Sequence, residues 1–292
     1  MANKRIGQQT IDLPLRPALC GNASFVGKKE GEGPLGSCFT HVADDELYGQ
    51  ESFELAEKQL YLDAIRMAIE KGGAKVEDVQ FLLGGDLLNQ IITASFSARD
   101  LGIPYIGLYG ACSTMSESLC LGGMLLDGEH ASQVVCAASS HFCTAERQYR
   151  YPLEFGAQRT PTAQWTVTGA GATLLSLQPK VKPLAHLVRI CMGRVVDLGI
   201  SDANNMGAAM APVGVIIGPW RCGKRRRERK TPLPLPRRDF WRRNADFASC
   251  SSAMAPILNL TKFFVKFRKI GFFCLQIILT NANRILYNVG RC

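Results

Sequence analysis

Predicted helices and apolar strands alternate along the first two thirds of the chain, and this alternation limits the folds that are open to it. Between residues 52 and 71, apolar side chains recur every three or four residues, which predicts an amphipathic helix. An apolar run at 79–83 follows two glycines and predicts a buried strand. Further helices are predicted at 90–99 and 112–126, and further strands at 103–108, 133–138, 167–177 and 185–198. This order is typical of βαβ units, so we expect an α/β fold around a parallel sheet.

The segments before and after Pro212 have net charges of opposite sign. Residues 1–212 carry 17 Lys and Arg against 22 Asp and Glu, a net charge of −5, whereas residues 213–292 carry 17 against 3, a net charge of +14. The helix–strand alternation stops at the same point. Because composition, charge and periodicity break together, we interpret 213–292 as a tail foreign to the fold, produced by a frameshift or an assembly artefact.

A genuine tail is the alternative to this interpretation. Its basic block at 221–230 would then be an arm for nucleic acid or for an anionic membrane. Aromatic residues interleave only weakly with the block and no nucleic-acid-binding fold surrounds it, so we expect no nucleic acid partner. The apolar run at 270–279 holds ten residues, fewer than the about 20 that a membrane-spanning helix needs.

The 11 cysteines stand singly in apolar surroundings, as buried cysteines commonly do. They form neither a CxxC pair nor a Cys/His cluster with zinc-like spacing, so we expect no metal site and no cofactor. The first residues carry charge but no following apolar region, which argues against a signal peptide. Together these features predict an intracellular protein.

Cys112 stands where an apolar strand runs through a glycine turn into a predicted helix, in the segment YGACSTM (109–115). The unpaired N–H groups and the positive dipole end of a helix N-terminus favour a thiolate, which suits a nucleophile. The alternative is that Cys112 is a small buried residue in a tight turn.

His141 directly follows the predicted strand that ends at Ala138. Ligands of open parallel sheets gather outside the carboxyl ends of the strands, and a histidine there can act as acid, base or carboxylate partner. The alternative is a loop histidine whose ring is hydrogen-bonded to the backbone.

Three arginines in the next polar segment offer forked hydrogen bonds to a small dicarboxylate: Arg147, Arg150 and Arg159. Surface ion pairs with Glu146 and Glu154 are the alternative account of these arginines.

Six segments of the first 212 residues, in order, resemble the stage V sporulation protein AD family. They are GPLGS (33–37), GGDLLNQ (84–90), GACSTM (110–115), SSHFCTAERQYRYPLEFG (139–156), TAQWTVTGAGA (162–172) and VVDLGISDANNMGAAMAP (195–212). The resemblance implies a thiolase-like α/β fold of two similar halves. We therefore assign 1–180 to the first half, 181–212 to the start of the second half, and 213–292 to the non-matching basic tail, which we expect to be disordered or misfolded, so that the second half is missing or disrupted.

The resemblance also implies a function. The family is regarded as binding dipicolinate, pyridine-2,6-dicarboxylate, during its uptake into the developing spore, and not as catalysing condensation. Cys112 and His141 would line the pocket at the place where the related enzymes carry out catalysis. The implied partners are dipicolinic acid, other stage V sporulation A-operon proteins and a second copy in a homodimer. The implied location is the forespore of a spore-forming bacterium, peripheral to the spore inner membrane. The alternative function is a thiolase-like acyl-condensing enzyme that uses Cys112.

Overall fold

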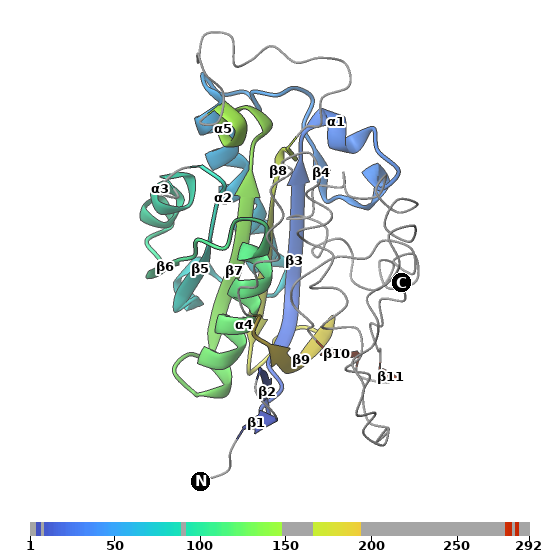
Figure 1. Ribbon diagram of the computed structural model, residues 1–292, viewed down its shortest axis with the longest axis vertical. Coiled ribbons are helices and arrows are strands. Elements are labelled where there is room, and N and C mark those ends of the chain that lie inside the picture. Colours follow the sequence, from blue (N-terminus) through green and yellow to red (C-terminus); the bar gives the residue numbers. More distant parts are fainter. Residues whose placement is uncertain are drawn as a thin grey trace, which may run out of the picture.

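The computed structural model describes residues 4–6, 9–88, 92–147, 166–193, 278–281 and 284–285, with side chains up to residue 145 and from 166 to 193. Its centre is one twisted sheet with helices on both faces (Figure 1). The α/β class predicted from the sequence is therefore confirmed.

Five strands form the middle of this sheet. In spatial order they are β6 (Tyr105–Gly107), β5 (Phe81–Gly85), β7 (Gln133–Ser140), β8 (Gly169–Ser176) and β3 (Ala18–Val26). Strand β5 is parallel to both β6 and β7, whereas β8 is antiparallel to both β7 and β3. Numbered along the chain, the five strands lie in the order 3-2-4-5-1, with the fifth antiparallel to its two neighbours.

The expectation of a purely parallel sheet is thus wrong at β8. Every residue of β8 is buried, as are seven of the eight residues of β7. A strand that is covered on both faces reads as a continuous apolar run in either direction, so its sequence does not reveal its polarity.

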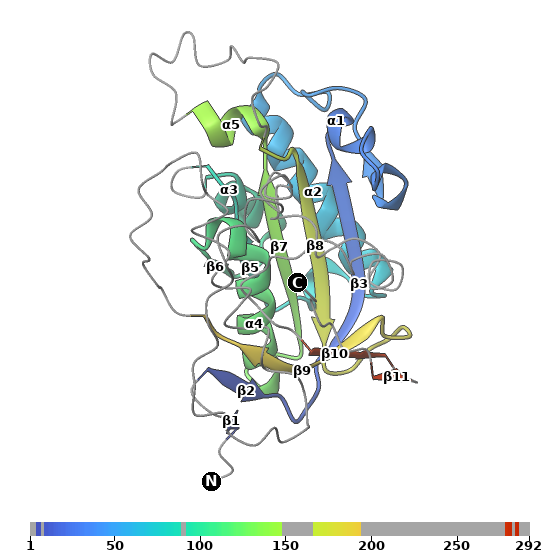
Figure 2. The ribbon, with the colours of Figure 1, turned by 45° about the vertical axis from the view of Figure 1, so that its right-hand side comes forward.

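Strand β9 (Ala185–Cys191) lies beyond β3, in the segment assigned to the start of the second half, and it pairs antiparallel with both β3 and β2 (Thr10–Asp12). Two short strands complete the sheet at its margins, β1 (Arg5–Ile6) beside β2 and β4 (His41–Val42) beside β3. Within the basic tail the structure describes β10 (Ile278–Asn281), antiparallel to β9, and β11 (Arg284–Ile285), antiparallel to β10 (Figure 2).

Two long helices cover opposite faces of the sheet. Helix α2 (Phe53–Lys71) packs on one face together with α3 (Ile92–Leu101), and α4 (Thr114–Asp127) packs on the other (Figures 1 and 2). Alternate residues of β7 point to the two sides, so that Val135 belongs to the core under α2 and Val134 to the core under α4. Burial of these apolar side chains on both faces is the main favourable contribution to the stability of such a layer.

Helix α2 has a defined start and end. The Ser52 hydroxyl accepts a hydrogen bond from the Leu55 N–H at 3.3 Å, which caps the first turn. The helix ends at Gly72 and Gly73, of which Gly73 has a φ of 69° that favours glycine. This end lies against β3 at Gly21, where a Cβ atom would stand 2.2 Å from the Ala68 carbonyl oxygen.

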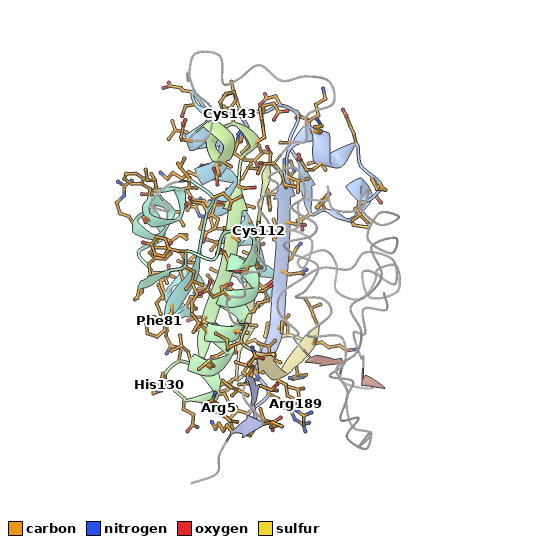
Figure 3. All side chains as sticks on the ribbon, viewed as in Figure 1. Arg5, Phe81, Cys112, His130, Cys143 and Arg189 are labelled. Carbon is orange, nitrogen blue, oxygen red and sulfur yellow. The ribbon has the colours of Figure 1, made fainter. Side chains whose placement is uncertain are left out.

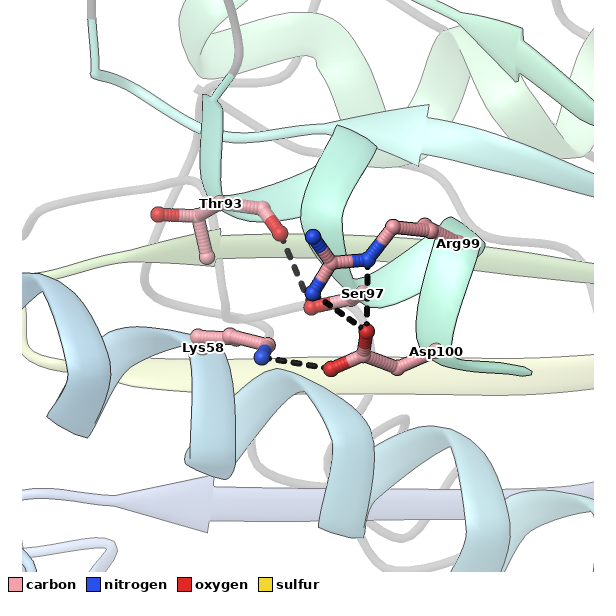
Figure 4. Close-up of polar contacts among 5 residues, drawn as sticks. All are labelled: Lys58, Thr93, Ser97, Arg99 and Asp100. Carbon is pink, nitrogen blue, oxygen red and sulfur yellow. Dashed lines mark hydrogen bonds and ion pairs between the residues drawn. The ribbon is translucent and has the colours of Figure 1, made fainter. Parts of the chain in front are cut away.

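Helix α3 is fastened to α2 by an ion pair (Figure 4). Lys58 Nζ of α2 lies 2.5 Å from Asp100 Oδ2, and Arg99 contacts the other oxygen of the same carboxylate at 2.7 Å. Within α3 the Ser97 hydroxyl donates to the Thr93 carbonyl at 2.8 Å. The ion pair thus adds to the core that the two helices share on this face.

Two short α-helices and two 3-10 turns also lie in the described ranges. They are α1 (Lys28–Gly31), α5 (Phe142–Arg147), and the 3-10 turns η1 (Gly36–Cys38) and η2 (Val76–Asp78). A further 3-10 turn, η4 (Ala111–Ser113), joins β6 to α4.

Candidate functional site

Three chemically capable side chains follow the parallel strands β5, β7 and β6. Asp86 comes after β5, Cys112 after β6 and His141 after β7. Because carboxyl ends of parallel strands meet at one edge of a sheet, all three residues belong to the edge at which α/β proteins bind ligands.

Cys112 is solvent-exposed in the 3-10 turn η4, immediately before α4 (Figure 3). The residue before it, Ala111, has a φ of 47°, in the region that favours glycine. Ser113 does not cap the helix with its side chain and instead donates from Oγ to the Gly110 carbonyl at 2.8 Å. The interpretation of Cys112 as a buried small residue is therefore wrong, because the strained turn presents the thiol to solvent.

The first turn of α4 carries a second notable group. Thr114 is only 2% exposed, and its Oγ1 is buried with no hydrogen-bond partner among the residues that the structure describes. Tyr109, three residues before Cys112, is 76% exposed. The start of α4 therefore combines an accessible thiol, an exposed aromatic ring and the N–H groups of a helix N-terminus.

His141 lies fully buried at the end of β7, and both of its ring nitrogens contact the backbone. Nδ1 accepts from the Cys143 N–H at 3.2 Å, so Nε2 carries the proton and donates to the Glu46 carbonyl at 2.9 Å. The ring also stacks on Phe53, with 5.0 Å between centroids, and lies 4.9 Å from the ring of Phe142. Burial lowers the pKa of His141, which keeps the ring neutral.

These contacts agree with the interpretation of His141 as a histidine that is hydrogen-bonded to the backbone. Its ring partners come from the loop at Glu46, from α2 and from α5, and Cys112 is not among them. A contact between His141 and a ligand stays a prediction.

Glu57, on α2, is a buried acid that the sequence reasoning missed. It is fully buried, and its two oxygens lie within hydrogen-bond distance of the hydroxyls of Ser139, at 2.9 Å, and Thr144, at 2.7 Å. Burial raises its pKa to about 7, and the nearby Asp86 carboxyl adds to the rise, while the two hydroxyls oppose it. Its position gave a signal, because Glu57 stands four residues after Phe53 and four before Tyr61, on the face of α2 that meets the core.

Asp86 is the second buried acid at this edge. Its oxygens accept from the backbone N–H groups of Leu88 at 2.8 Å and Ala94 at 2.7 Å, at the start of α3. Burial raises its pKa to about 6, although these backbone donors hold the value down. Asp86 thus supplies the acceptor that the first N–H groups of α3 need.

Several expected features lie outside the described residues. Arg150 and Arg159 lie outside them entirely, and only the backbone is described for Arg147.

No three His, Cys, Asp or Glu side chains in the described ranges are close enough together to hold a metal ion. None of the described helices is long and apolar enough to cross a membrane.

The central strands have the order 3-2-4-5-1, and a cysteine stands where β6 leads into α4. The fold is of the thiolase-like class, as predicted. The chain belongs to the stage V sporulation protein AD family, whose family model matches residues 7–217.

A relative within this family is the stage V sporulation protein AD of Bacillus subtilis (strain 168). It is 44% identical to this chain over 211 residues, which are 72% of this chain and 61% of the relative. The chain therefore spans about three fifths of the length of that relative, and the family name connects it with sporulation.

Similar solved structures include two synthases. A fungal type III polyketide synthase, ORAS, is 16% identical with a TM-score of 0.46, over 64% of this chain and 63% of that one. The 3-oxoacyl-(acyl carrier protein) synthase III of Pseudomonas aeruginosa PAO1 is 15% identical with a TM-score of 0.42, over 68% and 67%. Likenesses this remote assign no chemistry to the chain.

Proposed function

We propose that the family segment of this chain binds dipicolinate and acts in its uptake into the developing spore. The observation that carries this proposal is the 44% identity to the stage V sporulation protein AD of Bacillus subtilis across the matched 211 residues. Cys112 and His141, the residues that the family resemblance assigns to the pocket, both lie within residues 7–217, which the family model matches.

The chemistry at the start of α4 supports an aromatic dianion as the ligand. The N–H groups and the dipole of a helix N-terminus attract a carboxylate, and α4 has no side-chain cap from Ser113, although its first turn already carries Glu117. The exposed ring of Tyr109 offers a face on which a pyridine ring can stack. Cys112 lies between these two features in sequence and is exposed, so we expect a ligand bound at the start of α4 to contact its side chain.

Titration calorimetry with dipicolinate tests this function directly. We expect saturable binding with a dissociation constant in the range of about 1 μM to 1 mM, typical of small-ligand sites. Pyridine-3,5-dicarboxylate is the matched control, because it has the same charge and ring but spreads its carboxylates apart. Equal binding of both isomers, or no heat with either, would count against a dipicolinate site.

A thiolase-like condensing enzyme is the second candidate, because Cys112 is exposed at the turn that positions a nucleophile. Intact-mass measurement after incubation with an acyl-thioester would show an adduct on the chain if this function holds, and the Cys112→Ser variant would lack it. We expect no adduct, and we expect Cys112→Ser to bind dipicolinate within about threefold of the parent chain, since a binding site needs no thiolate.

The partners and the location follow from the same family membership. We infer an association with other stage V sporulation A-operon proteins, a homodimer, and a place in the forespore peripheral to the spore inner membrane. Fractionation of sporulating cells tests the location, because a peripheral protein should leave the membrane fraction at high salt.

A further inference from the structure

The hydroxyl of Thr144 has two acceptors but only one proton. Its Oγ1 lies 2.7 Å from Glu57 Oε2 and 3.2 Å from the carbonyl oxygen of His141. If Glu57 is ionised, the single hydroxyl proton can serve only one of these acceptors. If Glu57 is neutral and protonated on Oε2, it donates to Thr144, and Thr144 then donates to His141, so that both contacts are made.

The second carboxyl at this edge points to the same assignment. Asp86 lies close enough to raise the proton affinity of Glu57, and the groups that act on the two carboxyls include no described cation. Two neighbouring buried carboxyls without a cation do not both ionise readily. Asp86 accepts from backbone N–H groups at the start of a helix, which favours its charged form, whereas Glu57 is bonded only by two neutral hydroxyls.

Other titratable groups around Glu57 do not change this balance. Tyr61, one turn further along α2, is fully buried and donates from its hydroxyl to the Ala137 carbonyl. His141 is neutral and is bonded to Glu46 and Cys143. Neither residue supplies a positive charge to the carboxyl.

We propose that Glu57 is held as a neutral carboxylic acid that donates to Thr144, and that this proton helps to fix the end of β7 and the start of α5 against α2. Ser139 and Thr144 flank His141 on either side, so the same contacts set the position of the His141 ring. Ionisation of Glu57 leaves the single Thr144 proton to serve both the carboxylate and the His141 carbonyl, and it places a second negative charge beside Asp86, which loosens the start of α5. Glu57 is thus a positioning residue that makes this part of the candidate site sensitive to pH, whatever ligand the site binds.

Cys143, on α5, allows a direct test in the full chain. It is partly buried, whereas Cys112 is exposed, so peptide-resolved alkylation of Cys143 relative to Cys112 reports the loosening of α5. The neutral isostere Glu57→Gln offers an N–H donor to Thr144 and a carbonyl acceptor to Ser139, and it cannot ionise. Between about pH 6 and pH 8 we expect the Cys143/Cys112 ratio to rise about tenfold more in the parent chain than in Glu57→Gln.

A second variant tests whether the hydrogen bond from Glu57, rather than the shape of the Thr144 side chain, holds α5 in place. Thr144→Val keeps the shape but removes the group that receives the proton, so Cys143 should react readily at about pH 6 as well as at pH 8. Parallel profiles of the parent chain and Glu57→Gln would overturn the proposal. So would a Glu57→Gln variant that fails to fold, because a neutral isostere should make the same hydrogen bonds.

Discussion

Ala111 has a strained backbone beside the candidate site. Its φ of 47° lies in the left-handed region, where the Cβ atom of a residue other than glycine crowds the backbone. Replacing it with glycine removes that cost, which outweighs the larger entropy of glycine in the unfolded chain. We expect Ala111→Gly to raise the free energy of unfolding by about 0.5–1 kcal/mol, measured by denaturant titration. Ala74→Gly is the control and should lower it by a similar amount, because Ala74 is not among the residues with positive φ. If both variants lowered the free energy of unfolding equally, Ala111 would not be strained.

The pKa of Glu57 determines how stability varies with pH. Its ordinary value of 4.5 is raised to about 7 in the folded chain, so between these values the folded state holds a proton that the unfolded state has released. Stability from this group is fully present below about pH 4.5 and is lost as the pH rises toward about 7, a total loss of roughly 3 kcal/mol.

Glu57→Gln should remove this part of the pH dependence. Its free energy of unfolding, measured from about pH 5 to 8, should fall less steeply than that of the parent chain, by up to about 1.4 kcal/mol per pH unit. Asp86, whose pKa is raised to about 6, still contributes a decline with rising pH in both proteins. Identical slopes would show that Glu57 is ionised throughout.

Some residues of the candidate site could be identified from the sequence, and others could not, for physical reasons. Cys112 was found because a glycine turn before a helix is visible in the sequence, and His141 because it directly follows a strand. The tautomer of His141 could not be predicted, since the Glu46 carbonyl comes from a loop 95 residues away. Glu57 was detectable as an acid on an apolar face, but its partners Ser139 and Thr144 are set by tertiary packing.

Among the elements, the contact between α2 and β3 depends on the absence of a side chain at Gly21. A Cβ there would lie 2.2 Å from the Ala68 carbonyl and 2.5 Å from the Gly72 nitrogen, and both neighbours are backbone atoms that cannot rotate away. We expect Gly21→Ala to lower the free energy of unfolding by about 2–4 kcal/mol. Gly33→Ala is the matched control, with one contact at 3.2 Å, and should change stability by less than about 1 kcal/mol. Similar losses in both variants would mean that α2 can shift away from β3.

Most helices and strands between residues 52 and 191 were predictable, whereas β3 (Ala18–Val26) was not predicted and the strand directions could not be read from the sequence. The predicted helix at 52–71 matches α2, because its apolar spacing and the two terminal glycines are local signals. The predicted helix at 112–126 began too early, since Ala111–Ser113 forms a 3-10 turn before α4 starts at Thr114. Helix α5 was missed within a polar segment, because six residues are too few to show a helical period.

For the whole molecule, the break at Pro212 has a consequence that the coding DNA can test. If a frameshift produced the basic tail, translation of the other two frames beyond residue 212 should recover a continuing alternation of helices and strands. The family match extends to residue 217, close to the predicted break. Frames filled with stop codons would contradict a frameshift and favour a genuine tail.

The same break predicts how the chain behaves on expression. A thiolase-like half buries one of its helical faces against a second half, and an apolar face that lacks this cover favours association. We expect low soluble yield and self-association of the 292-residue chain, with a minor fraction recovered as folded monomer. A high yield of monomer would show that residues 213–292 cover this face.

A chimera tests whether a second half is needed for tight binding of dipicolinate. In it, residues 218–292 are replaced by the part of the Bacillus subtilis relative that follows the matched 211 residues. If loops of a second half close the pocket at the carboxyl edge of the sheet, the chimera should bind dipicolinate at least about tenfold more tightly than the parent chain, by calorimetry. Cys112→Trp in the chimera is the control, because a bulky side chain at the start of α4 should block the site. Equal affinity of chimera and parent chain would mean that the described half holds the ligand by itself, and binding that survives Cys112→Trp would place the site away from α4.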